Sequence, residues 1–86
     1  MKTFQYTITD PVGIHLRTVT PLVKKVKEFP GHEITITKGE NTVSLLRSSA
    51  VLKMAVKQGE TVTVSVSGDN EEAAAAALEA FFKEKL

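Results

Sequence analysis

A glycine, a histidine and an arginine stand at alternate positions near the start of the chain, as Gly13, His15 and Arg17. A neutral imidazole nitrogen is a competent nucleophile toward phosphorus near neutral pH. An arginine can hold phosphoryl oxygens through its planar guanidinium. The glycine allows a turn before the histidine, since it tolerates positive φ. This combination makes His15 a candidate reversible phosphoryl acceptor, with Arg17 as its phosphate partner. Taken alone, a histidine that only caps a helix or makes a surface hydrogen bond is the simpler interpretation.

The residues around this triplet place His15 at the start of a helix. Residues 10–13, Asp-Pro-Val-Gly, interrupt an alternating pattern, because proline lacks an amide donor. After His15 the apolar residues recur at three- and four-residue intervals, which predicts a helix with one buried face. Unpaired amide groups and the helix dipole favour an anion at such a helix start. The apolar face comprises Leu16, Val19, Leu22, Val23, Val26 and Phe29.

This first helix contains a proline and ends at another. Pro21 lies about one turn in, so we expect an irregular first turn or a position at which its missing amide was not needed. Pro30 and Gly31 then end the helix.

The other strands and helices are predicted from the spacing of apolar residues, which repeats every two residues in strands and every three or four in helices. Alternation of apolar and polar residues predicts strands over residues 2–9, 34–37, 43–45 and 61–66. Helical spacing predicts a short helix over residues 47–56. A last helix begins after a possible capping box from Asp69 to Glu72. Its buried face comprises Ala74, Ala77, Leu78, Phe81 and Phe82.

The order β-α-β-β-α-β-α predicts an α+β fold, an open-faced β-sandwich with a four-stranded antiparallel sheet and three helices on one face. With 86 residues, the chain is long enough for one domain, spanning residues 1–86. So short a chain leaves little room for a deep cleft. A carrier or a binding module is therefore favoured over a free-standing enzyme.

Composition excludes several other functions. A net charge of +1, one tyrosine and no tryptophan give no argument for nucleic-acid binding. The absence of cysteine excludes disulfides and thiolate metal sites. No spacing predicts a metal site, a Ser-His-Asp triad or a phosphate loop, and we expect no cofactor. No signal peptide or bilayer-spanning run is present, so we expect a cytoplasmic protein without membrane insertion.

Charge is uneven between the predicted helices. The last helix is mainly acidic, whereas the first two carry Arg17, Lys24, Lys25, Lys27, Arg47, Lys53 and Lys57 against Glu28. This bias would steer an acidic protein surface or a phosphate toward one end of the helical layer. Taken alone, solvated helix faces are the simpler interpretation. A second histidine, His32, precedes a strand without a nearby cation and receives no role.

The segment from Gly13 to Thr20, Gly-Ile-His-Leu-Arg-Thr-Val-Thr, resembles the active-site motif of the HPr family. These proteins are histidine-containing phosphocarriers of the bacterial sugar phosphotransferase system, with the common pattern Gly-Ile/Leu-His-Ala-Arg-Pro-Ala. Gly13, His15 and Arg17 match it position by position. The resemblance extends over the whole chain in length, in the order of elements and in a second segment, residues 56–59.

This resemblance implies a relay. Enzyme I, a phosphoenolpyruvate-dependent kinase, would phosphorylate Nδ1 of His15, and the carrier would pass the group to the EIIA component of a sugar permease. Arg17 would contact the phosphate, and the first two helices would dock both proteins. The alternative is an HPr-like regulatory or interaction module that binds partners without relaying phosphate.

The chain departs from the family pattern around this site. Thr18 replaces a proline, and its hydroxyl could bind the phosphate or a backbone group; Leu16 replaces a small residue and enlarges the apolar rim. A regulatory serine of many Gram-positive members aligns with Arg47, so we expect no regulatory phosphorylation. Ser48 would be such a site only in a slipped alignment. The docking residues implied are Leu16, Thr18, Lys24, Lys27, Arg47, Ser48 and Ser49, although the two serines are more simply explained as caps of the short helix.

Overall fold

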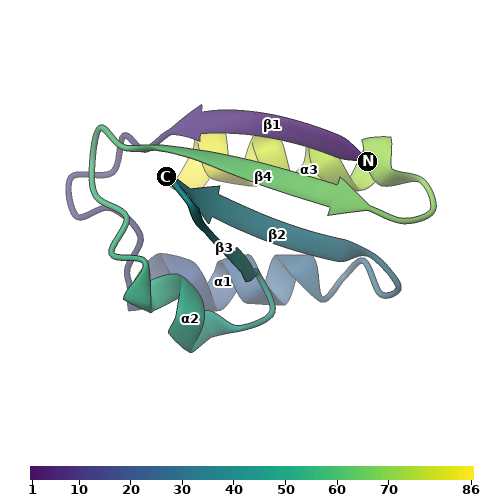
Figure 1. The fold of residues 1–86 in the computed structure, drawn as a ribbon, viewed down its shortest axis with the longest axis horizontal. Helices are drawn as coiled ribbons and strands as arrows, with labels where there is room; N and C mark the ends of the chain where they lie inside the picture. The colour runs from purple at the N-terminus through teal and green to yellow at the C-terminus, as the bar shows by residue number, and fades with distance from the viewer.

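A computed structural model describes residues 1–86 and contains seven elements in the predicted order. They are β1 (Lys2–Thr7), α1 (Leu16–Val26), β2 (Glu33–Lys38), β3 (Asn41–Ser44), α2 (Ser48–Lys53), β4 (Thr61–Ser67) and α3 (Glu71–Lys85). The strands form one antiparallel sheet in the order β1-β4-β2-β3, with α1 and α3 behind it (Figure 1). The short α2 packs against α1 and β3 and continues the helical layer. The α+β open-faced sandwich is thus confirmed.

The register of the strands separates an apolar face from a hydroxyl-rich face. Val64 of β4 pairs with Phe4 on one side and with Ile36 on the other. One residue along, Ser65 pairs with Thr3 and Thr35. Because neighbouring residues of a strand point to opposite faces, the first row faces the helices and the second faces outward. The helices therefore cover only the apolar face.

The helices complete the core with narrow buried stripes. Val19, Leu22 and Val26 of α1 are buried, as is the line Ala74, Leu78 and Phe82 along α3. The Phe82 ring meets Phe4 and Tyr6 edge-on, at centroid distances of 5.6 and 5.7 Å. Such edge-to-face pairs add to the burial of the rings themselves.

Five residues predicted on buried helix faces are less buried than expected. Val23 and Phe29 are only half-buried, and Phe29 lies beyond the end of α1 at Val26. Leu16 is 66% exposed, because the first residue of α1 lies beyond the core. Ala77 and Phe81 are only half-buried, since α3 meets the sheet along a single line. Leu86 occupies the core instead.

The starts of α2 and α3 also differ from the predictions. The capping box from Asp69 is wrong: the residue before α3 is Asn70, in the left-handed region at φ 57°, and it makes no side-chain cap bond. Helix α2 begins at Ser48 after Arg47 and likewise has no side-chain cap bond, so the capping role of the serines is also wrong. The helix predicted over residues 47–56 is shorter because the chain leaves it at Met54 and enters the left-handed region at Ala55.

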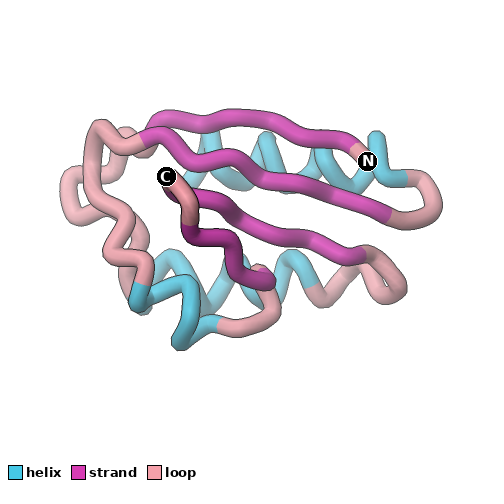
Figure 2. Tube along the Cα trace, viewed as in Figure 1, coloured by secondary structure: helices cyan, strands magenta, loops and turns pink.

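Two of the loops that connect the helices and strands lie at the same end of the sheet (Figure 2). The loop after β1 and the segment before β4 meet there, since Thr7 pairs with Thr61 and the amide of Ile8 donates to the carbonyl of Glu60. The first of these loops leads from β1 directly into the start of α1. This end of the molecule therefore holds the predicted acceptor.

Lys38 connects the end of α2 to the segment before β4 through three polar contacts. Its Nζ donates to the carbonyls of Met54 and Ala55, at 3.1 and 3.3 Å, and lies 3.1 Å from a carboxylate oxygen of Glu60. The other Glu60 oxygen accepts from the Lys57 amide at 2.7 Å. The amide of Lys57 and then the ammonium of Lys38 hold the pKa of Glu60 below its ordinary value.

We expect Glu60→Gln to melt at a lower temperature than the wild type at pH 7. A carboxylate whose pKa is lowered in the folded state stabilises the fold above its ordinary pKa, about 4.3, and loses this contribution as the pH falls through the lower value. The melting temperatures of the two proteins, followed by circular dichroism, should therefore converge as the pH falls through the lowered pKa of Glu60. Glu40→Gln removes an exposed carboxylate without an ion pair and should change neither curve. A difference that persists unchanged in acid would contradict the ionic origin.

Candidate active site

His15 is the residue that begins α1. Its backbone is extended, at φ −142° and ψ 178°, and its Nδ1 accepts a hydrogen bond from the backbone amide of Arg17 at 3.3 Å. A ring nitrogen that accepts a hydrogen bond carries no proton, so this contact assigns the proton of the neutral ring to Nε2. The side chain is 28% exposed. The Nδ1 lone pair is thus held at the helix start.

Thr18 fixes the backbone of His15 from inside the helix. Its hydroxyl donates to the His15 carbonyl at 3.0 Å and accepts from the His15 amide at 3.1 Å. Thr18 itself is buried. Of the two roles that the sequence left open for this hydroxyl, the structure shows the contact with a backbone group. Two hydrogen bonds thereby hold the start of a helix that continues through Pro21.

Gly13 lets the loop pack directly on the chain after α2. It has φ +82°, and a Cβ atom built there would lie 2.3 Å from the Val56 carbonyl oxygen. The next amide, that of Ile14, donates to this same oxygen at 2.9 Å. Positive φ and the close approach each favour glycine. The Ile14 side chain is buried in the core, so the residue before His15 is anchored twice.

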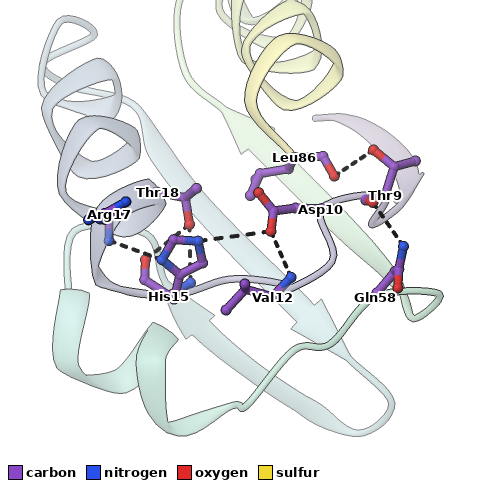
Figure 3. A network of polar contacts seen from close by, with 8 residues as sticks. All are labelled: Thr9, Asp10, Val12, His15, Arg17, Thr18, Gln58 and Leu86. Atoms are coloured by element: carbon purple, nitrogen blue, oxygen red, sulfur yellow. Dashed lines mark hydrogen bonds and ion pairs between the residues drawn. The ribbon is translucent and has the colours of Figure 1, made fainter.

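Asp10 lies on the side of the imidazole away from Arg17 (Figure 3). Its Oδ1 accepts from the Val12 amide at 2.8 Å and lies 3.9 Å from His15 Nε2. The sequence pattern indicated only a turn at Asp10, because the five-residue separation from His15 says nothing about distance. Its proximity to the imidazole could not be predicted.

The structure groups three of the predicted docking residues in one groove. Lys24, Lys27 and Ser48 line a shallow groove of about 260 Å³ between α1 and α2, together with Thr20 and Val23. Leu16, Arg17, Arg47 and Ser49 are exposed. The structure does not bring Thr18 to the surface with them.

Two exposed apolar residues were not predicted as surface features. Val12 is 67% exposed in the loop before His15, and Leu46 is 51% exposed next to Arg47. Figure 3 shows Val12 on the loop beside the His15 ring, so the apolar rim expected from Leu16 has a second member. The exposure of Val12 could have been predicted from its place inside the turn segment Asp-Pro-Val-Gly, because turns lie at the surface.

The guanidinium of Arg17 makes no hydrogen bond or ion pair, although the backbone amide of this residue contacts His15. The charge on this side chain is therefore available to a ligand. No group of three or more His, Cys, Asp or Glu residues could hold a metal ion, and no helix combines the length and apolarity that crossing a membrane requires.

The family model described as the PTS HPr component phosphorylation site, where PTS denotes the phosphotransferase system, matches residues 2–84. The chain belongs to the HPr family. It is 38% identical to the phosphocarrier protein HPr of Lysinibacillus sphaericus over 78 residues, which cover 91% of this chain and 88% of that protein. The HPr of Mycoplasma capricolum is 33% identical over 78 residues, covering 91% and 86% of the two chains.

Solved structures agree with this assignment. A histidine-containing phosphocarrier protein of Mycoplasma matches at a TM-score of 0.90 and 30% identity, covering 96% of this chain and 93% of that chain. HPr from Thermoanaerobacter tengcongensis matches at a TM-score of 0.86 and 30% identity over both complete chains. The protein is thus an HPr-family phosphocarrier of the phosphotransferase system.

Proposed function

We propose that this HPr-family chain accepts a phosphoryl group on Nδ1 of His15 from phosphoenolpyruvate-dependent enzyme I and passes it to EIIA of a sugar permease. The observation that supports this most directly is the Nδ1 lone pair, held at the start of α1 in a partly exposed ring. We further propose that residues 1–86 act as one HPr-like domain in the cytoplasm.

The neighbours of Nδ1 suit a transient phosphoryl group. Nδ1 attacks phosphorus, the bond from phosphorus to its previous carrier breaks, and the phosphoryl oxygens take over the Arg17 amide as a donor. The unpaired guanidinium of Arg17 supplies a second, charged donor. This set is small, which suits a carrier, because a group that is bound too tightly cannot be passed on.

The partner surface we propose combines charge with an apolar rim. Arg17, Lys24, Lys27 and Arg47 would attract an acidic surface, and Leu16 would pack against it beside His15. The exposed Ser48 and Ser49 would contribute polar contacts at the start of α2. Arg47 places a permanent positive charge there, so we propose no regulatory phosphorylation of this region.

Incubation with phosphoenolpyruvate and the cognate enzyme I tests the relay. We expect one acid-labile phosphate in the intact-mass spectrum, and loss of that phosphate when EIIA is added. A protein that binds enzyme I in a titration yet gains no phosphate would overturn the carrier function. It would instead support an interaction module on the same fold.

Arg17→Ala is expected to slow phosphoryl transfer roughly tenfold to a hundredfold, since a hydrogen bond to a charged group contributes about 1.5–3 kcal/mol. The exposed guanidinium has no partner in the protein, so the melting temperature should not change. Single-turnover transfer from phosphorylated enzyme I measures the effect. Arg17→Lys, which keeps the charge but not the planar fork, should fall between the two. Equal rates for all three proteins would show that Arg17 does not contact the phosphate.

A further inference from the structure

We propose that Asp10 is a positioning residue whose carboxylate keeps the proton on Nε2 of His15 throughout the phosphorylation cycle. The ring would then always leave phosphorus as a neutral imidazole. This inference rests on the proposed acceptor role of His15 and adds a second residue to that site.

The Asp10 carboxylate is held in place by the loop around it. Its Oδ1 accepts from the Val12 amide at 2.8 Å. The carbonyl of Asp10 accepts from the Gly13 amide at 2.9 Å, and its own amide donates to the carbonyl of Leu86 at 2.8 Å. The side chain is only 25% exposed. One hydrogen bond thus holds the carboxylate and two hold the backbone of Asp10, which together keep the carboxylate beside the imidazole.

The imidazole is oriented between two groups of opposite character (Figure 3). The Arg17 amide donates to Nδ1, which keeps that nitrogen free of a proton. The Asp10 oxygen lies 3.9 Å from Nε2, which favours a proton on that side. The two contacts therefore select the same tautomer, in which Nδ1 is the nucleophile.

Two cationic residues on the neighbouring segments would oppose protonation of the ring. Arg17 on α1 is cationic, and Lys57 follows Val56 on the segment packed against Gly13. From the end of α3 only the Leu86 carbonyl reaches the loop, and it contacts the backbone of Thr9 and Asp10. Asp10 is the one carboxylate within 4 Å of the imidazole nitrogens.

The proton on Nε2 matters when phosphate leaves. In the forward step Nδ1 shares its electron pair with phosphorus while Nε2 keeps its proton, so the phosphorylated ring carries a positive charge. In the onward step the bond between Nδ1 and phosphorus breaks, and the electron pair returns to Nδ1. With the proton still on Nε2 the leaving group is neutral imidazole; without it, the leaving group is the much more basic imidazolate.

The negative charge of Asp10 is not needed for the turn. An asparagine oxygen would accept from the Val12 amide equally well. A carboxylate beside a phosphoryl group is, by contrast, electrostatically unfavourable. Its presence 3.9 Å from Nε2 is explained by an interaction with the cationic ring.

Asp10→Asn separates these roles, because it keeps the turn and removes the charge. The wild type, Asp10→Asn and the matched charge control Glu28→Gln, at the far end of α1, are phosphorylated with phosphoramidate, without any enzyme. Phosphate release from His15 is followed by ³¹P NMR at pH 5 and pH 8. We expect Asp10→Asn to release phosphate severalfold more slowly at pH 8, because the carboxylate that favours the proton on Nε2 is gone. At pH 5 all three should release it equally.

A second measurement distinguishes this inference from the relay itself. In ¹⁵N NMR of the unphosphorylated protein, the wild type should hold the neutral His15 proton on Nε2, and Asp10→Asn should show a larger share on Nδ1. Equal release at pH 8 together with equal tautomer populations would overturn the role of Asp10, whether or not enzyme I phosphorylates the protein. Slower release by the variant would support it even if the relay failed.

Discussion

Replacing His15 with alanine is expected to abolish phosphoryl acceptance while leaving the protein folded. Removal of the nucleophile should lower incorporation of acid-labile phosphate by about a thousandfold or more, since the residue that forms the covalent intermediate is gone. The lost contact between Nδ1 and the Arg17 amide should lower the free energy of unfolding by about 0.5–2 kcal/mol, as for other helix-capping residues. Labelled phosphoenolpyruvate with enzyme I measures the first effect, and urea denaturation the second.

His32→Ala is the matched control, because it removes the other histidine of the chain. His32 follows the opposite end of α1, where its ring contacts the carbonyls of Phe29 and Asp69. This variant should accept phosphate at the wild-type rate. If His32→Ala lost acceptance and His15→Ala kept it, the acceptor would be misassigned.

Gly13→Ala is expected to destabilise the fold by about 2–5 kcal/mol, from left-handed strain and a steric clash together. The strain arises at φ +82°, and the new Cβ would lie 2.3 Å from the Val56 carbonyl oxygen and 2.8 Å from the Lys57 Cα. Both atoms belong to the backbone, so relief requires the loop and the segment after α2 to separate. That movement would also displace His15, and the rate of phosphoryl acceptance should fall with the stability.

Gly59→Ala is the matched control for Gly13→Ala, because it introduces the left-handed backbone strain without the steric clash. Gly59 has a similar φ of +88°, but no atom lies within 4 Å of a Cβ built there. Its replacement should cost only about 1–2 kcal/mol, the left-handed penalty alone, and should leave acceptance unchanged. Urea denaturation of the two variants compares these values. Equal losses of stability would show that the contact between Gly13 and Val56 is not tight.

The order of elements could be predicted because its signals are local. Alternation in β4 and the spacing of Val19, Leu22 and Val26 in α1 express the periods of strand and helix, which neighbouring residues determine. The triplet of Gly13, His15 and Arg17 is likewise local. Its chemistry follows from residue type and from the helix start that immediately follows it.

Helix ends were predicted less well, because packing decides them. The buried face of α1 excludes Leu16, since the sheet does not extend that far. Helix α2 ends at Lys53, where Lys38 of a distant strand takes the carbonyls of Met54 and Ala55. No local pattern in residues 47–56 carries that information.

The sequence by itself determined which residue is the candidate nucleophile, which cation stands beside it and which family the chain resembles. The tertiary structure decided how that nucleophile is held. Thr18 binds the His15 backbone, Gly13 packs on Val56, and the Asp10 carboxylate faces Nε2. These contacts depend on the path of the loop and on segments that meet only after folding, and their distances cannot be derived from residue types alone.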